Sequence, residues 1–187
     1  ATSPQRPASQ GTTYCNLTAK GFNLNRRQVQ NATMSAANPS SVNYYESARR
    51  HFHDAGVLLG GSRSANAGQL FGIAAECGIK AILVVSQVPV DADGSIDRLP
   101  GVKGKAFREH WPELGQALTN LAGDIPDGRT ATTYLSLIPN LLHFSDWLIE
   151  HRYWHDAALP LASVGRWQAA ATEVMTALDQ AKVDGKF

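Results

Sequence analysis

The chain has 187 residues, of which 43% are hydrophobic and 18% charged, and its formal net charge is +1. This length allows one domain of ordinary size, and the mixed composition excludes collagen, low-complexity disorder and coiled-coil rods. The longest uninterrupted apolar run, residues 81–85, is far shorter than the roughly 20 residues that span a bilayer, and no signal-peptide pattern is present. Because Cys15 and Cys77 make no disulfide framework, we expect a cytoplasmic protein with no membrane partner.

Residues 1–38 are predicted to form an extended, mostly irregular N-terminal arm, because large apolar residues are sparse and Pro, Ser, Thr, Asn and Gln are frequent. The first 41 residues contain four basic residues and no acidic one, which leaves the rest of the chain at −3. Such a basic arm can bind a polyanion or an acidic neighbouring subunit. The alternative is that its charges are simply solvated.

The first helix of the body is predicted to start after Asn38-Pro39-Ser40-Ser41, because a serine oxygen can accept an orphan N–H group at a helix start. Apolar residues then recur at spacings of three and four, which is one face of a helix. These residues are Tyr45, Ala48, Phe52, Ala55 and Leu59. Gly60-Gly61 is predicted to end this helix.

A second helix is predicted to start near Ser62 or Ser64. Its apolar face is formed by Leu70, Ile73, Cys77, Ala81 and Val84. Glu76 and Lys80 lie one turn apart on this helix, and we expect them to pair at the surface.

A loop is predicted over residues 87–104, followed by a third helix over 111–121 with Pro112 in its first turn. After a turn at 123–128, residues 130–150 are predicted to be helical, with Pro139 breaking or kinking the helix. Residues 154–160 are predicted to be irregular. The last helix has strict spacing of its apolar residues, which are Val164, Trp167, Ala171, Val174, Leu178 and Ala181.

These patterns predict an all-α fold. Residues 39–187 are expected to form an antiparallel bundle of four or five helices, since the loops are mostly short and no strand ladder appears between residues 40 and 183.

The second-helix run from Ala65 to Ala81, which includes Ala75-Glu76-Cys77-Gly78-Ile79-Lys80-Ala81, resembles the second helix of HEPN domains, the nucleotide-binding helical domains of higher eukaryotes and prokaryotes. Asp54-Ala55-Gly56-Val57-Leu58 is similar to the pattern of the first helix in that family, and His110-Trp111-Pro112-Glu113-Leu114 to the start of the third. The segment from Phe144 to Tyr153 resembles one found in uncharacterised bacterial relatives.

The resemblance implies a helical bundle over about residues 43–183 that forms a homodimer. Many HEPN proteins are metal-independent ribonucleases of toxin–antitoxin, phage-defence and RNA-processing systems. Their hallmark is an Arg followed by four to six residues and a His, one set from each protomer meeting at the dimer interface.

The residues that match this chemistry best lie between Glu150 and Asp156. Metal-free RNA cleavage needs a base for the 2′-hydroxyl, an acid for the leaving oxygen and a cation for the phosphorane charge. The candidates are Arg152 for the phosphate, His155 or His151 as acid and base, and Tyr153 as a positioning group. Arg152 and His155 are separated by two residues, which departs from the hallmark. The other interpretation is a solvated helix end whose aromatic side chains pack on the bundle.

Arg49, Arg50 and His53 form a second polar group, on the first helix. They are candidate phosphate-binding residues, and Glu76 and Lys80 join them as candidate binding residues; the alternative for the first group is an ordinary exposed polar face. His151 and His155 are one turn apart but lack the Glu of a His-Glu-x-x-His zinc site. We therefore expect no metal and no other cofactor.

The sequence thus leads to three hypotheses. The first is an HEPN-like module that dimerises and binds RNA, a nucleotide or a protein partner. The second is a metal-independent ribonuclease that uses the cluster at residues 151–155. The third is a helical bundle without a nucleic-acid role, whose likeness to the family reflects common helix-forming residues.

Overall fold

The computed structural model describes residues 41–96, 106–120 and 122–187, and within these ranges the protein is all-α, as the sequence predicts. The only β-type pairing among these residues is a single bridge between Val90 and Ile96. The predicted N-terminal arm, residues 1–38, and residues 97–104 of the predicted loop lie outside the described residues.

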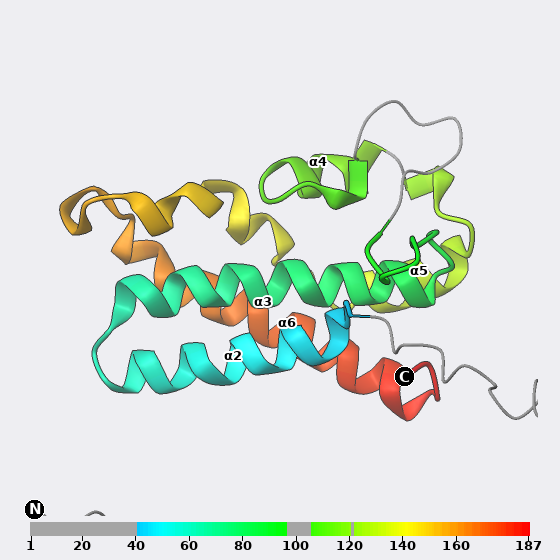
Figure 1. Cartoon of the computed structure of the whole chain (residues 1–187), viewed down its shortest axis with the longest axis horizontal. Coiled ribbons are helices and arrows are strands. Elements are labelled where there is room, and N and C mark those ends of the chain that lie inside the picture. The colour runs from blue at the N-terminus through cyan, green and yellow to red at the C-terminus, as the bar shows by residue number, and fades with distance from the viewer. Residues whose placement is uncertain (1–40, 97–105, 121) are drawn as a thin grey trace, which may run out of the picture. The chain divides into compact units, whose positions relative to one another are not determined.

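Two long helices, α2 (Tyr44–Gly60) and α3 (Ser64–Val85), form an antiparallel hairpin (Figure 1). The first helix begins later than the Ser40-Ser41 signal predicts, because Asn43 is its cap: the Asn43 side-chain oxygen accepts the Glu46 N–H at 3.0 Å. The C-terminal helix α6 (Val164–Val183) packs against α3 and also contacts α2. Its predicted apolar face is confirmed, since all six residues of that face are buried.

α3 is the central helix of the bundle, and it is buried on almost every side. The predicted apolar stripe is only partly right: Leu70, Ile73, Cys77 and Val84 are half-buried, whereas residues between them are fully buried. α3 is long and apolar enough to cross a bilayer, but 72% of its most apolar stretch is buried within the protein. The core helix of a bundle has the same properties.

Glycines on α3 allow other elements to approach it closely. A Cβ atom at Gly72 would lie 2.0 Å from the indole of Trp147, and one at Gly78 would lie 2.2 Å from Val174 of α6. The Trp147 indole N–H donates to the carbonyl oxygen of Gly68 at 3.2 Å. Gly72 therefore leaves room for the Trp147 indole, and Gly78 allows α6 to pack closely against α3.

The segment between α3 and α6 is less helical than the sequence predicts. α4 (Glu113–Asn120) begins just after Pro112, and α5 (Gly128–Leu135) is capped by Asp127. The helix predicted over residues 130–150, with Pro139 breaking or kinking it, is only partly right: α5 ends at Leu135, before Pro139, and 3₁₀ helices follow in place of further α-helix. Pro139 lacks an N–H group and so cannot continue an α-helical hydrogen-bond ladder.

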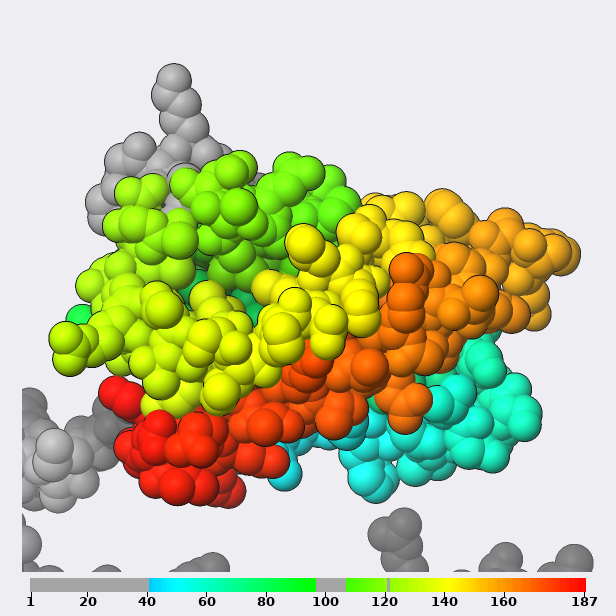
Figure 2. Space-filling model, turned by 180° about the vertical axis from the view of Figure 1, so that it is seen from behind, coloured from blue at the N-terminus to red at the C-terminus, as the bar shows by residue number. Residues whose placement is uncertain are grey.

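Four 3₁₀ helices, called the 3₁₀ segment below, connect α5 to α6. Their bounds are η3 (Leu141–Asp146), η4 (Ile149–Tyr153), η5 (Asp156–Ala158) and η6 (Leu161–Ser163). In Figure 1 this segment, yellow to orange, runs along α3 on the side away from α2. Seen from behind, it lies beside α6 (Figure 2).

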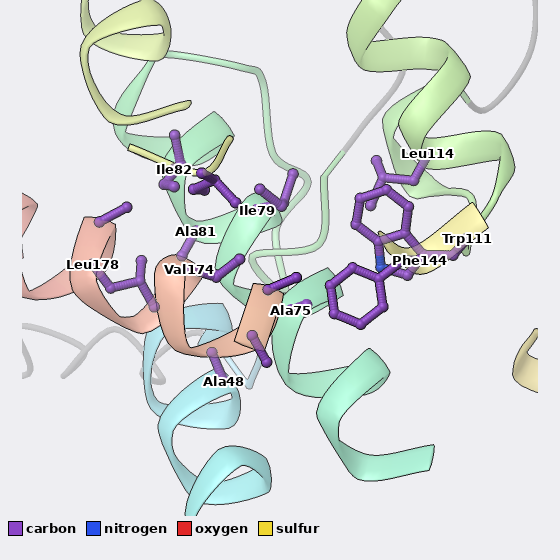
Figure 3. Packing of buried hydrophobic residues seen from close by; sticks show 14 of the residues in the cluster. Ala48, Ala75, Ile79, Ala81, Ile82, Trp111, Leu114, Phe144, Val174 and Leu178 are labelled. Atoms are coloured by element: carbon purple, nitrogen blue, oxygen red, sulfur yellow. The ribbon is translucent and has the colours of Figure 1, made fainter. Parts of the chain in front are cut away.

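The core is continuous from α2 through α3 and α6 to α4 (Figure 3). Trp111, which precedes α4, stacks on Phe144 of η3 with 5.4 Å between the ring centroids. This contact holds the start of α4 against the 3₁₀ segment, and both elements carry candidate site residues.

Candidate functional site

Residues Arg152–His155, called the corner below, lie at the end of η4 and just beyond it. Asp146 anchors the segment that leads to the corner: its carboxylate accepts hydrogen bonds from Ser163 at 2.5 Å, Arg166 at 2.7 Å and the Trp167 indole at 3.0 Å. Burial alone would raise the pKa of Asp146, but these hydrogen bonds and the Arg166 charge outweigh it and hold the pKa below its usual value. A second anchor is Gln69 of α3, whose side-chain amide donates to the Ile149 carbonyl at 3.2 Å.

His151 is placed inside the protein, just before the corner. It is only 6% exposed and packs against the rings of Trp154 and Trp167, with centroid distances of 4.5 and 6.0 Å. Its Nδ1 faces the Leu148 N–H at 3.4 Å. Burial lowers the pKa of this imidazole. His151 therefore packs beneath the corner as a buried side chain. This burial does not fit its expected role as an acid or base in contact with a ligand.

The other three catalytic candidates lie together at the surface. The Arg152 guanidinium lies over the Tyr153 ring, 4.7 Å from its centroid. Tyr153 is 75% exposed and Trp154 is 43% exposed. His155 is exposed, and its Nδ1 accepts the Ala157 N–H at 3.2 Å, which leaves Nε2 to carry the proton of the neutral ring. The corner thus offers one cation, two aromatic faces and one N–H donor.

Arg49, Arg50 and His53 lie on the exposed side of α2, but each interacts with a different neighbour. Arg49 forms an ion pair with Asp179 of α6. Arg50 donates to the Ser47 hydroxyl at 3.3 Å, and His53 lies 3.4 Å from Asp54. These contacts do not bring the three side chains into one site.

Glu76 and Lys80 form the predicted ion pair, at 2.7 Å, but the expectation that they pair at the surface is wrong. Both side chains are buried, because α3 is covered on the side that faces the start of α4. Lys80 also donates to the Arg108 carbonyl at 3.1 Å, and the second oxygen of Glu76 accepts from Nδ1 of His110 at 2.8 Å. A carboxylate accepts only, so Nδ1 of His110 must carry a proton.

Beside His110 lies a pocket of about 310 Å³, called the acceptor pocket below. It is lined by Glu109, His110, Trp111, Glu113, Leu148, Ile149 and Glu150. Sequence reasoning did not select these residues as a site, because they come from two segments that only the fold brings together. The available signal was the pair Glu76 and Lys80, one turn apart in an otherwise apolar helix. When such a pair is buried, its remaining hydrogen-bonding groups need further partners, and one of these partners is His110.

In the described part of the chain, no group of three or more His, Cys, Asp or Glu side chains is arranged to hold a metal ion. Comparisons with protein-family models, with curated proteins and with solved structures found no match to this chain.

Proposed function

We propose that this protein is a helical module that binds single-stranded RNA through the corner. The observation that carries the proposal is the stack of Arg152 on the largely exposed Tyr153, next to the half-exposed Trp154. Aromatic rings and arginine guanidinium planes are the surfaces on which proteins commonly stack unpaired RNA bases. The likeness of the second helix to HEPN domains, which include many RNA-processing proteins, supports the same ligand.

The net negative charge of residues 42–187 favours a site that recognises a few nucleotides over one that binds a long stretch of the RNA phosphate backbone. Residues 42–187 carry a formal charge of −3, and the corner lies between Glu150 and Asp156. A surface that binds mainly by neutralising phosphates needs many unpaired cations. We therefore expect affinity to come from stacking and from the single Arg152 charge, with a shallow dependence on salt.

Fluorescence anisotropy with a labelled single-stranded RNA tests the proposal. Arg152→Ala and Tyr153→Ala should each weaken binding roughly 5- to 150-fold, since stacking of one base is worth about 1–3 kcal/mol. Tyr153→Phe keeps the ring and should bind as the parent does. Arg129→Ala, which removes an exposed arginine of α5, is the matched control. Loss of binding in the control, or no loss at the corner, would contradict the proposal.

A metal-independent ribonuclease is the second candidate, favoured by the exposure of both Arg152 and His155 in one corner. In this reaction Arg152 would bind the phosphate, the imidazolium form of His155 would give its Nε2 proton to the leaving oxygen, and the proton of the attacking 2′-hydroxyl would pass to water. Cleavage of RNA in the presence of a chelator, abolished by both Arg152→Ala and His155→Ala, would support it. RNA binding without cleavage would support the binding module alone.

A further inference from the structure

We propose that the acceptor pocket holds a guanine base of the RNA that is bound at the corner. This inference rests on the proposed function and adds base selectivity to it. It follows from the chemistry of the groups that line the pocket, from the orientation of His110, and from the place of Glu150 in the pocket wall, two residues before Arg152 of the corner.

Buried Glu76 fixes the hydrogen-bonding character of His110. Because the Nδ1 proton of His110 is donated to Glu76 at 2.8 Å, Nε2 of the neutral ring is an acceptor. The imidazole side chain is 51% exposed although its partner Glu76 is buried. Lys80 neutralises the Glu76 charge within the core. The ring therefore presents an acceptor outside the core, at the wall of the pocket.

The three carboxylates of the pocket are also acceptors, whereas the buried indole N–H of Trp111, which has no hydrogen-bond partner in the described part of the chain, is a donor. Glu109, Glu113 and Glu150 make no hydrogen bond or ion pair with another residue in the described part of the chain. Arg108, the nearest arginine in sequence to Glu109 and Glu113, pairs with Asp91 at 3.7 Å. A ligand for this pocket must consequently supply several N–H donors, together with an acceptor for the Trp111 indole N–H.

Among the RNA bases, guanine is the one with two adjacent donor groups on its Watson–Crick edge, N1–H and N2–H₂. A single carboxylate can accept from both, which gives a bidentate contact. Adenine, cytosine and uracil alternate donors with acceptors on that edge, so each would place an acceptor against a carboxylate. The pocket thus favours guanine and disfavours the other three bases.

The pocket also suits a flat ring that belongs to a chain bound at the corner. Leu148 and Ile149 supply apolar surface, and a volume of about 310 Å³ is at the small end of ligand pockets. Glu150 lines the pocket and lies in η4 two residues before Arg152. A nucleotide can therefore direct its base into the pocket while its phosphate remains on the side of Arg152.

The test compares labelled heptamers of uridine whose central residue is uridine, adenosine, cytidine, guanosine or inosine, using the full chain and anisotropy. We expect the guanosine RNA to bind at least about tenfold more tightly than the uridine, adenosine and cytidine RNAs. Inosine lacks the N2 amino group, so it should lose most of this preference.

The variants Glu109→Gln, Glu113→Gln and Glu150→Gln locate the site. At least one should abolish the guanosine preference while leaving the affinity for the all-uridine RNA unchanged; Glu46→Gln, on the exposed side of α2, should keep the preference. Equal binding of all five RNAs, or a preference that survives all three pocket variants, would overturn the inference and leave the proposed function standing. Absence of binding to every RNA would overturn both.

Discussion

Glu76 and Lys80 show how burial changes the meaning of an acid–base pair on a helix. At a surface, such a pair stabilises a helix by a few tenths of a kcal/mol. Here both side chains are buried and bonded to further groups, the Arg108 carbonyl and the His110 ring. The pair thereby fixes the residues before α4 on the central helix and determines the orientation of His110.

Removing one member of this pair should be strongly destabilising, because the other charge is left buried without its partner. We expect Lys80→Met to lower the free energy of unfolding by about 3–5 kcal/mol, measured by urea denaturation. The double variant Glu76→Leu/Lys80→Met should recover a large part of this loss. Lys182→Met, at an exposed position of α6, is the control. A Lys80→Met protein as stable as the control would show that the pair is not buried.

His151 should make stability dependent on pH. Its pKa is lowered in the folded protein by burial, so the unfolded chain binds a proton more readily, and stability is lost as pH falls through the ordinary histidine range near 6.5. His151→Asn keeps a side-chain acceptor for the Leu148 N–H but does not titrate. Thermal unfolding between pH 7.5 and 5 should show a smaller loss of stability in this variant than in the parent. An identical loss would contradict this account of His151.

At the scale of elements, contact between α3 and the 3₁₀ segment depends on the absence of a side chain at Gly72. A Cβ atom there would overlap the Trp147 indole, so Gly72→Ala should lower the free energy of unfolding by about 1–3 kcal/mol or more. Gly165→Ala in α6 meets no atom within 4 Å and should raise stability by about 0.5–1 kcal/mol, because alanine is the better helix former. Equal effects of the two substitutions, measured by chemical denaturation, would contradict the close packing of Trp147 on Gly72.

Helices with a regular apolar face were predictable from the sequence, and those without one were not. The face of α6 and the hairpin of α2 and α3 follow from spacings of three and four. α3 itself has apolar residues all round, so its pattern did not show which side meets Trp147. The 3₁₀ helices after α5 were missed because their turns are too short to build a periodic stripe.

At the scale of the whole molecule, the corner was predictable as a cluster in sequence, but the exposure of its members was not. Arg152, Tyr153 and His155 are near neighbours in the chain, and a local search finds them. Whether His151 faces water or Trp167 depends on α6, which follows later in the chain. The acceptor pocket requires that residues 109–113 meet residues 148–150, a contact that no local pattern indicates.

We predict that the protein is a homodimer, because the resemblance of its second-helix sequence to that of HEPN domains would imply one. Light scattering of the full chain should give twice the chain mass of 20.1 kDa, and removal of residues 1–38 should weaken the dimer more than it lowers the melting temperature of the body. A single species of 20.1 kDa at high concentration would refute the dimer. An unchanged dimer after the truncation would refute the role of the arm.

The most direct test of the central claim, that the corner is the RNA-binding surface, is a map of backbone amide ¹H–¹⁵N shifts during titration with a short single-stranded RNA. Our account predicts that the largest shifts fall at residues 148–156, next to Arg152 and Tyr153, and extend to residues 109–113 around the acceptor pocket. Shifts concentrated on the exposed side of α2 around Arg49, Arg50 and His53, or no shifts at saturating RNA, would contradict it.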